Sequence, residues 1–285
     1  MFAFDPEKFI STESLGSGPL GSVHPYRKDP GDNQWVIKRI FVEDTNSLLL
    51  RLNEVTIGYS CSHSGIIPLN GYAIEALEGQ SANIYIKMPR MKENLTDYIK
   101  RNNDKGIRNL TEEKIVKYFY SLVNALEYLH EKQIAHRDIK PTNVLFDEED
   151  NIKLSDVSSA GFVIEEESIE PFNQQTTDVS YTAPEILLDS VQDNKELYAA
   201  DIWSLGLILA EMCMFKCIGI NPEKQNSKTV PKTILKQVRK SYSNNMVEIL
   251  KQMLKIDPRE RKTASEIRQI LEEKYHSLSV KIKDN

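Results

Sequence analysis

Three side chains with complementary chemistry lie close together in the segment IAHRDIKPTNVLF. Asp138, Lys140 and Asn143 fall within six residues of each other, and Asp156 follows Asp138 by 18 residues. Carboxylate and amide oxygens are the ligands that Mg²⁺ prefers, so Asn143 and Asp156 are candidate metal ligands. That assignment leaves Asp138 to orient an attacking hydroxyl and accept its proton. Lys140 is then placed to stabilise a transferring phosphoryl group.

A second cluster has the residue types of a phosphate-binding loop. Gly16, Gly18 and Gly21 form the pattern G-x-G-x-x-G, followed by Val23. Glycine lets the backbone approach phosphate oxygens, with amide N–H groups as donors. The spacing alone is a weak signal, because glycine trios also occur in hairpins and in dinucleotide-binding turns. Strand-like sequence follows here instead of a long helix, which favours a loop between strands.

Lys38 and Glu54 complete the candidate phosphate site. Lys38 lies in WVIK, 15 residues beyond Val23, and Glu54 lies in a stretch with helical character. A lone lysine is usually a surface residue. With the glycines before it and a carboxylate after it, Lys38 becomes a candidate to reach the phosphates while Glu54 holds its ammonium group.

The elements that must position these groups change character along the chain. Residues 10–90 contain short β-branched and aromatic runs, WVIKRIFV and ANIYIKM, which predict strands, and one helical stretch, SLLLRLNEVTIGY. From about residue 94 the periodicity is helical. VLFDEEDNIKLSD predicts a hairpin with an acidic turn, and DIWSLGLILAEMCMF predicts an apolar helix in a second core.

One helix is predicted in particular detail. In TEEKIVKYFYSLVNALEYLHEK, Thr111 is a plausible N-cap ahead of two glutamates. The apolar side chains expected on its buried face are Ile115, Tyr118, Phe119, Leu122, Leu126 and Leu129.

Composition limits the function classes. The 36 basic and 42 acidic side chains give a net charge of −6, which argues against a general nucleic-acid binder. Cys61, Cys213 and Cys217 do not suggest a disulfide framework, which indicates a reducing compartment, cytoplasmic or nuclear. Cys213 and Cys217 are four apart and could share a helix face as metal ligands, but no His or Cys pair nearby completes the set, so we expect buried thiols. The start of the chain does not resemble a signal peptide, and the longest apolar stretch is expected to be too short to span a membrane.

From about residue 10 to 275 the chain resembles a eukaryotic-type protein kinase. The motifs that carry the resemblance are GSGPLGSV, WVIK, NEV, HRDIKPTN, SDVS, APE at 183–185 and DIWSLG at 201–206. The resemblance implies an α+β fold with a β-rich N-lobe at residues 1–90 and a larger helical C-lobe at residues 91–285, together one catalytic domain. With Lys140 two residues after Asp138, the segment HRDIKPTN resembles that of the serine/threonine-directed branch of the family.

The resemblance also implies ATP and Mg²⁺ as cofactors and adds residues to the site. It places Met88 at the back of the adenine pocket, with the Pro89 carbonyl and the Met91 amide as adenine partners. The residues implied to bind ATP are Gly16, Gly18, Gly21, Val23, Lys38, Met88, Pro89, Met91 and Leu145. Glu185 of APE is implied to pair with Arg261, and Thr176, Thr177 and Ser180 are candidate phosphorylation sites.

Three departures from the family pattern concern regulation. Val157 and Ser158 stand where the family has Phe-Gly, and the smaller valine predicts a cavity or looser packing. Gly58 stands four residues after Glu54, where the family tends to have a bulky apolar residue. Asp178 replaces a threonine before the APE element. None of these residues is expected to contact ATP, metal or the transferred phosphoryl group.

These features predict an ATP-dependent serine/threonine protein kinase that also phosphorylates itself. Its partners would be protein substrates and an activating kinase or partner protein, with no nucleic acid and no membrane span. The first alternative is a pseudokinase scaffold that binds nucleotide or partners without efficient catalysis. The second is a kinase-fold enzyme that acts on small molecules, which the APE element and the 30-residue activation segment disfavour.

Overall fold

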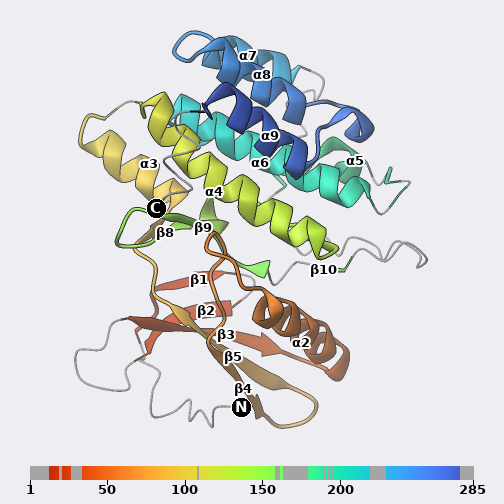
Figure 1. Cartoon of the computed structure of the whole chain (residues 1–285). Coiled ribbons are helices and arrows are strands. Elements are labelled where there is room, and N and C mark those ends of the chain that lie inside the picture. The colour runs from red at the N-terminus through yellow and green to blue at the C-terminus, as the bar shows by residue number, and fades with distance from the viewer. Residues whose placement is uncertain are drawn as a thin grey trace.

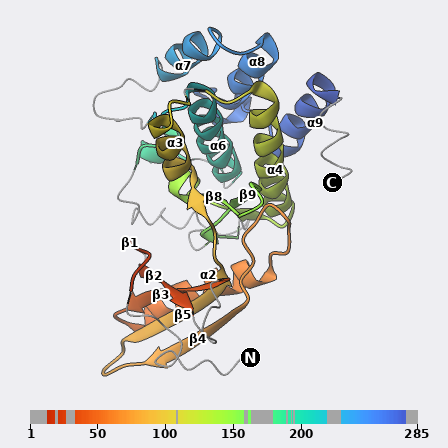
Figure 2. The same cartoon turned by 90° about the vertical axis from the view of Figure 1, so that its left-hand side faces the viewer.

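The computed structural model of the chain has two lobes, a smaller one built on a β-sheet and a larger one built of helices (Figure 1). A view at 90° shows the same division (Figure 2). The structure describes residues 13–18, 21–26, 34–107, 109–157, 161–162, 179–188, 190–191, 193, 195–218 and 229–276, and in these all side chains except those of 53, 54, 161 and 162. The predicted α+β architecture is confirmed.

The smaller lobe is an antiparallel sheet with one helix packed on it. The sheet has the order β1-β2-β3-β5-β4, with β1 at Gly16–Gly18, β2 at Gly21–Tyr26, β3 at Trp35–Val42, β5 at Ala82–Pro89 and β4 at Gly71–Ala76. Helix α2, Thr45–Ser60, begins at Asp44, whose carboxylate accepts the Ser47 N–H. Ile40, Ile84 and Val55 join the sheet to this helix in one apolar cluster.

The larger lobe consists mainly of helices. Its helices are α3 at Leu95–Asp104, α4 at Glu112–Glu131, α5 at Pro184–Leu187, α6 at Glu196–Met214, α7 at Val230–Val238, α8 at Asn244–Met253 and α9 at Ala264–Lys274. Thr111 caps α4 by accepting the Lys114 N–H, as predicted. The six apolar residues predicted to face inward from α4 are all buried.

Short strands connect this helical lobe to the predicted site. Strands β8, Val144–Phe146, and β9, Ile152–Leu154, form the antiparallel hairpin predicted from VLFDEEDNIKLSD, and β6, Glu93–Asn94, pairs with β8. The acidic turn closes on Asp147, whose carboxylate accepts the Asn151 N–H. Strand β7, Ile134–Ala135, pairs with β10, Gly161–Phe162.

The loop after α2 fastens the two lobes to each other. Leu154 of β9 donates its N–H to the Gly65 carbonyl at 2.8 Å and accepts from the Ile67 N–H at 2.9 Å. A Cβ added to Gly65 would lie 2.9 Å from the Ser121 carbonyl of α4, so glycine allows this close approach. Two residues beyond Leu154 the chain reaches Asp156, and the loop therefore positions that residue relative to α2.

Helix α6 is longer than the sequence analysis expected. It has 19 residues because it begins at Glu196, ahead of the DIWSLG motif, and its length and apolar composition would suffice to cross a membrane. Of its most apolar window, 72% is buried inside the helical lobe. A buried core helix accounts for this composition, and in the described part of the chain no other helix reaches the same length and hydropathy.

The cysteines partly follow the prediction. Cys61 and Cys213 are buried, and burial raises the pKa of both thiols, which disfavours the thiolate form that binds metals. Cys217 is exposed, against expectation, because α6 ends at Phe215 in a left-handed turn and Cys217 lies beyond the buried helix. Among the described residues, no three His, Cys, Asp or Glu side chains are grouped to hold a metal ion.

His63, in the loop after α2, is expected to make the contact between the two lobes depend on pH. Its Nδ1 accepts the Gly65 N–H at 3.0 Å and its ring stacks on Tyr128. Burial, and secondly the Lys153 charge, hold the pKa of His63 below its usual value. The His63 ring therefore binds a proton more readily in the unfolded chain than in the folded one. The contribution of neutral His63 to folding stability is present above about pH 6.5 and is lost as the pH falls through its folded-state pKa.

We therefore expect the melting temperature to fall on acidification from about pH 7.5 to about pH 5, and to fall less in His63→Asn. The asparagine Oδ1 can accept the Gly65 N–H but does not titrate in this range. Thermal unfolding of the two proteins across this interval is the measurement. Identical pH profiles would show that His63 does not contribute.

Candidate functional site

Asp138 and Asn143 are buried polar residues joined directly to each other. They lie in the loop that follows β7 and in the short 3₁₀ helix η1, Pro141–Asn143, and are 6% and 7% exposed. The Asn143 Nδ2 donates to the Asp138 Oδ2 at 2.9 Å and to its carbonyl at 2.8 Å. Lys140 places its Nζ 2.9 Å from the same Oδ2. The three residues grouped by sequence spacing therefore form one contact set.

A buried aspartate of α6 holds this loop in place. Asp201, 1% exposed, accepts the backbone N–H of His136 and of Arg137, each at 2.8 Å, and pairs with the His130 ring at 3.0 Å. Arg137 has a φ of 65°, a backbone conformation that residues other than glycine adopt only at an energetic cost. Asp201 belongs to the DIWSLG motif, and no role was predicted for it from sequence.

Asp156 meets Lys38 from the other lobe. The Lys38 Nζ donates to the Asp156 Oδ1 at 2.6 Å, and both side chains are mostly buried. Asp156 also has a positive φ, 58°. The preceding residue, Ser155, bonds from its N–H and hydroxyl to the Asn143 carbonyl, and its own carbonyl contacts the His136 ring at 3.0 Å. These bonds bring Asp156 and Asn143 to one site.

The oxygen atoms present there fit a hard divalent cation. The Asn143 amide nitrogen is directed at Asp138, so its amide oxygen is directed away and can serve as a ligand. Asp156 adds a carboxylate. One amide oxygen and one carboxylate match the way proteins hold Mg²⁺, which takes its other ligands from water and from substrate phosphates.

The glycines of the G-x-G-x-x-G pattern lie in the β1–β2 hairpin, and β2 pairs with the strand that carries Lys38. Strands β1 and β2 pair with Gly18 opposite Gly21, and Val23 lies opposite Lys38 on β3. Gly16 and Gly18 are exposed, and a Cβ added at either would meet nothing within 4 Å. Gly21 differs, because its φ is +121° and an added Cβ would lie 2.0 Å from the Arg39 carbonyl. The fold therefore needs a glycine at position 21.

We expect Gly21→Ala to raise the KM for ATP about tenfold or more, because the added methyl forces β2 away from β3 at the strand that carries Lys38. Gly71→Ala in β4 of the same sheet is the control, because an added Cβ there meets nothing within 4 Å, and it should leave KM within about twofold. Initial-rate kinetics against ATP concentration measure both. Equal effects of the two substitutions would contradict the requirement at position 21.

The remaining residues implied to bind ATP lie along the connection between the lobes. Met88 packs partly against the cluster of the sheet and α2, Pro89 ends β5, and Met91 follows, half-buried. The connection is held by the Arg90 N–H to the Gln34 carbonyl at 2.7 Å and by the Lys92 N–H to the Phe146 carbonyl at 2.8 Å. Leu145 is half-buried in β8, where it pairs with β6 and β9.

Some predicted residues lie outside the described part. Glu54 belongs to α2, but its side chain is not described, so the predicted Lys38–Glu54 pair stays a prediction. Ser158, Thr176, Thr177 and Asp178 also lie outside the described residues. Ser180 is described and is half-buried in a turn before α5.

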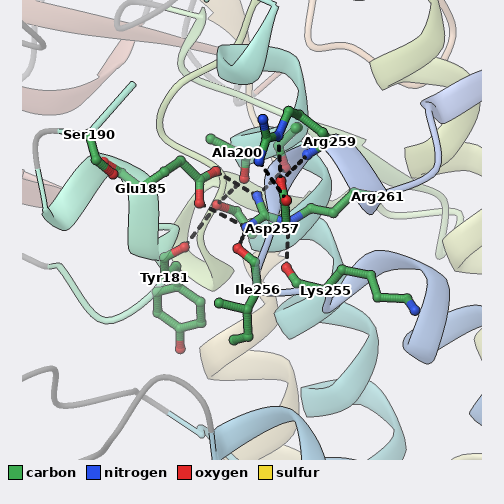
Figure 3. A network of polar contacts seen from close by, with 11 residues as sticks. Tyr181, Glu185, Ser190, Ala200, Lys255, Ile256, Asp257, Arg259 and Arg261 are labelled. Carbon is green, nitrogen blue, oxygen red and sulfur yellow. Dashed lines mark hydrogen bonds and ion pairs between the residues drawn. The ribbon is translucent and has the colours of Figure 1, made fainter. Parts of the chain in front are cut away.

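The predicted Glu185–Arg261 pair is confirmed and is the centre of a buried network (Figure 3). The Arg261 Nη1 and Nη2 donate to the two carboxylate oxygens of Glu185 at 2.6 and 2.8 Å. The guanidinium also donates to the carbonyls of Ala199, Lys255 and Ile256 and lies 5.1 Å from the Trp203 ring centroid. This pair fastens α5 to the segment that leads into α9.

Val157 lies against helix α2 at Gly58. Val157 is buried, and a Cβ added to Gly58 would come within 2.9 Å of the Val157 Cγ2 and 2.6 Å of the Leu69 Cδ1. The absence of a side chain at Gly58 lets α2 approach Val157 directly.

Comparison with known proteins agrees with this geometry. The family model described as "Protein kinase domain" matches residues 9–275. A probable CTD kinase subunit alpha homolog of Encephalitozoon cuniculi is 31% identical over 70% of this chain and 55% of its own length. The serine/threonine-protein kinase Nek6 of Oryza sativa is 26% identical over 92% of this chain and 47% of its own length.

A further relative is similar in length to this chain. A probable cell division protein kinase of Encephalitozoon cuniculi is 26% identical over 94% of this chain and 98% of its own length. By contrast, the chain spans about half the length of the CTD kinase homolog and of Nek6.

Proposed function

Because the chain belongs to the protein kinase family, we propose that it transfers the γ-phosphoryl group of Mg-ATP to serine and threonine hydroxyls of proteins, including its own. The observation that supports this most is the joint placement of two contact sets. Asp138, Lys140 and Asn143 form one, and Lys38 with Asp156 forms the other. The names of the relatives, serine/threonine-protein kinase among them, support the serine/threonine direction.

Each side chain has a role that its contacts allow. The Asp138 carboxylate orients the attacking hydroxyl and accepts its proton, while Asn143 fixes the orientation of that carboxylate. Lys140, bonded to the same carboxylate oxygen, is placed to donate to the transferring phosphoryl group. Lys38 binds the phosphates of ATP as a point charge, and Gly16, Gly18 and Gly21 cover them with the backbone.

The metal ion would be held by one residue from each set. Asn143 and Asp156 would hold it, and bound Mg²⁺ neutralises the charge of the phosphate oxygens. The Lys38 Nζ lies 2.6 Å from the Asp156 Oδ1.

We propose that the protein substrate binds at a small hollow beside Asp138. Its lining comes from the catalytic loop (residues 136–143), from α5 and the residues before it, and from α6. It includes Asp138, Lys140, Tyr181, Ile186, Leu197 and Ser204. We further propose an activating kinase or partner protein, since two relatives are named as a cyclin-dependent kinase and as a kinase subunit. Localisation in the cytoplasm or nucleus stays a prediction.

A pseudokinase scaffold is the second candidate, because Val157 and Ser158 depart from the family pattern next to Asp156. The two candidates separate when the chain is incubated with Mg-ATP and a mixed serine-, threonine- and tyrosine-containing protein substrate. Phosphoserine or phosphothreonine on the substrate, absent with Lys38→Met, would support the kinase. Thermal stabilisation by Mg-ATP with no labelled protein would favour the scaffold.

A further inference from the structure

Gly58 lies where the apolar cores of the two lobes meet. Ile57, the residue before it, is fully buried and belongs to the core of the helical lobe, as does Val157. Leu69 packs against the cluster formed by the sheet and α2. A Cβ at position 58 would contact both Leu69 and Val157 at distances shorter than normal van der Waals contact. The glycine therefore sets how closely α2 approaches the segment that carries Asp156.

The two neighbours would respond differently to a side chain at position 58. The Leu69 Cδ1 is the end of a flexible side chain and can rotate away. The Val157 Cγ2 belongs to a β-branched residue, whose χ1 is restricted. Val157 is also held by its neighbours, because Ser155 and Leu154 are hydrogen-bonded to the catalytic loop and to the loop after α2. A methyl group on residue 58 therefore acts on Val157 and, through it, on Asp156.

We propose that Gly58 and Val157 form a size-matched pair in which Gly58 is a positioning residue for the Lys38–Asp156 contact. The inference rests on the proposed function, since it concerns the same ATP site. It accounts for two departures from the family pattern with one contact: the small residue on α2 allows the helix to close the space left by the small residue after Asp156. Substitution of either residue alone disturbs the fit.

The test is a cycle of Gly58→Ala, Val157→Ala and the double variant. Gly58→Ala is expected to raise the KM for ATP about tenfold, with the KM for the protein substrate unchanged. Adding Val157→Ala removes the Cγ2 methyl and is expected to restore the KM for ATP to within about threefold of wild type. Thr56→Ala is the control and should leave the KM for ATP near wild type. This substitution also raises helix propensity, but Thr56 lies on the exposed face of α2.

An unchanged KM for ATP in Gly58→Ala, or a raised value that Val157→Ala does not lower, would overturn the proposal. Crystal structures of the single and double variants give a second readout that needs no activity. We expect α2 displaced from residue 157 in Gly58→Ala and returned in the double variant. If wild type neither binds nor uses ATP, the proposed function fails, while α2 in its wild-type position in Gly58→Ala refutes the size-matched pair by itself.

Discussion

Replacing Asp138 with asparagine is expected to lower kcat for phosphoryl transfer about 10²–10⁴-fold, the range that a positioned general base contributes. Asparagine is nearly the same size, so the loop should keep its contacts with Asn143 and Lys140. Its amide cannot accept the proton of the attacking hydroxyl. The affinity for Mg-ATP should stay near wild type, because Asp138 is assigned to the hydroxyl and not to the nucleotide.

The measurement is kcat with a peptide substrate, together with the thermal shift caused by Mg-ATP. Asp147→Asn is the matched control, an aspartate-to-asparagine change at the turn of the neighbouring hairpin. A loss of activity in both variants would point to disturbed folding. Full activity in Asp138→Asn would remove the proposed general base.

Arg261→Ala is expected to lower the free energy of unfolding by about 3–5 kcal/mol, because it leaves a buried carboxylate without its counter-charge. The Arg261 side chain is 0% exposed and that of Glu185 is 5% exposed. Three backbone carbonyls also lose their donor. In a chain of this size the loss corresponds to a fall in Tm of about 6–20 °C.

Arg259 provides a matched control two residues away. Its side chain is 72% exposed and pairs with the partly exposed Asp257 at 2.8 Å, so Arg259→Ala should change Tm little. Calorimetric melting of both variants compares the buried pair with the exposed one. A Tm for Arg261→Ala close to that of Arg259→Ala would contradict the importance of the Glu185–Arg261 pair for stability.

Local patterns predicted the elements well because their signals lie within a few residues. The Thr111 cap and the inward face of α4 follow from the 3.6-residue period, and the β8–β9 hairpin follows from apolar runs around an acidic turn. Spacing likewise brought Asp138, Lys140 and Asn143 together. The Glu185–Arg261 pair, 76 residues apart, came from the family resemblance and not from local pattern.

What the sequence could not predict depends on how separate elements approach each other. Asp201 supports the catalytic loop across more than 60 residues of sequence, and its one signal was a place in the DIWSLG motif. The close approach of α2 to Val157 at Gly58 was not predicted, because the size of Val157 was considered without the position of the helix. Side-chain volumes determine packing only when the distance between the backbones is known.

The central claim, that Asp156-Val157-Ser158 supports catalysis, is tested most directly by the intact mass of the purified chain after incubation with Mg-ATP. We expect wild type to gain whole phosphoryl groups and Asp138→Asn to gain none. Peptide mapping of the product would then examine Thr176, Thr177 and Ser180. No mass gain in wild type, also after addition of a protein substrate, together with thermal stabilisation by Mg-ATP, would contradict catalysis by the chain on its own. That result would point to a nucleotide-binding scaffold or to a kinase that needs its activator.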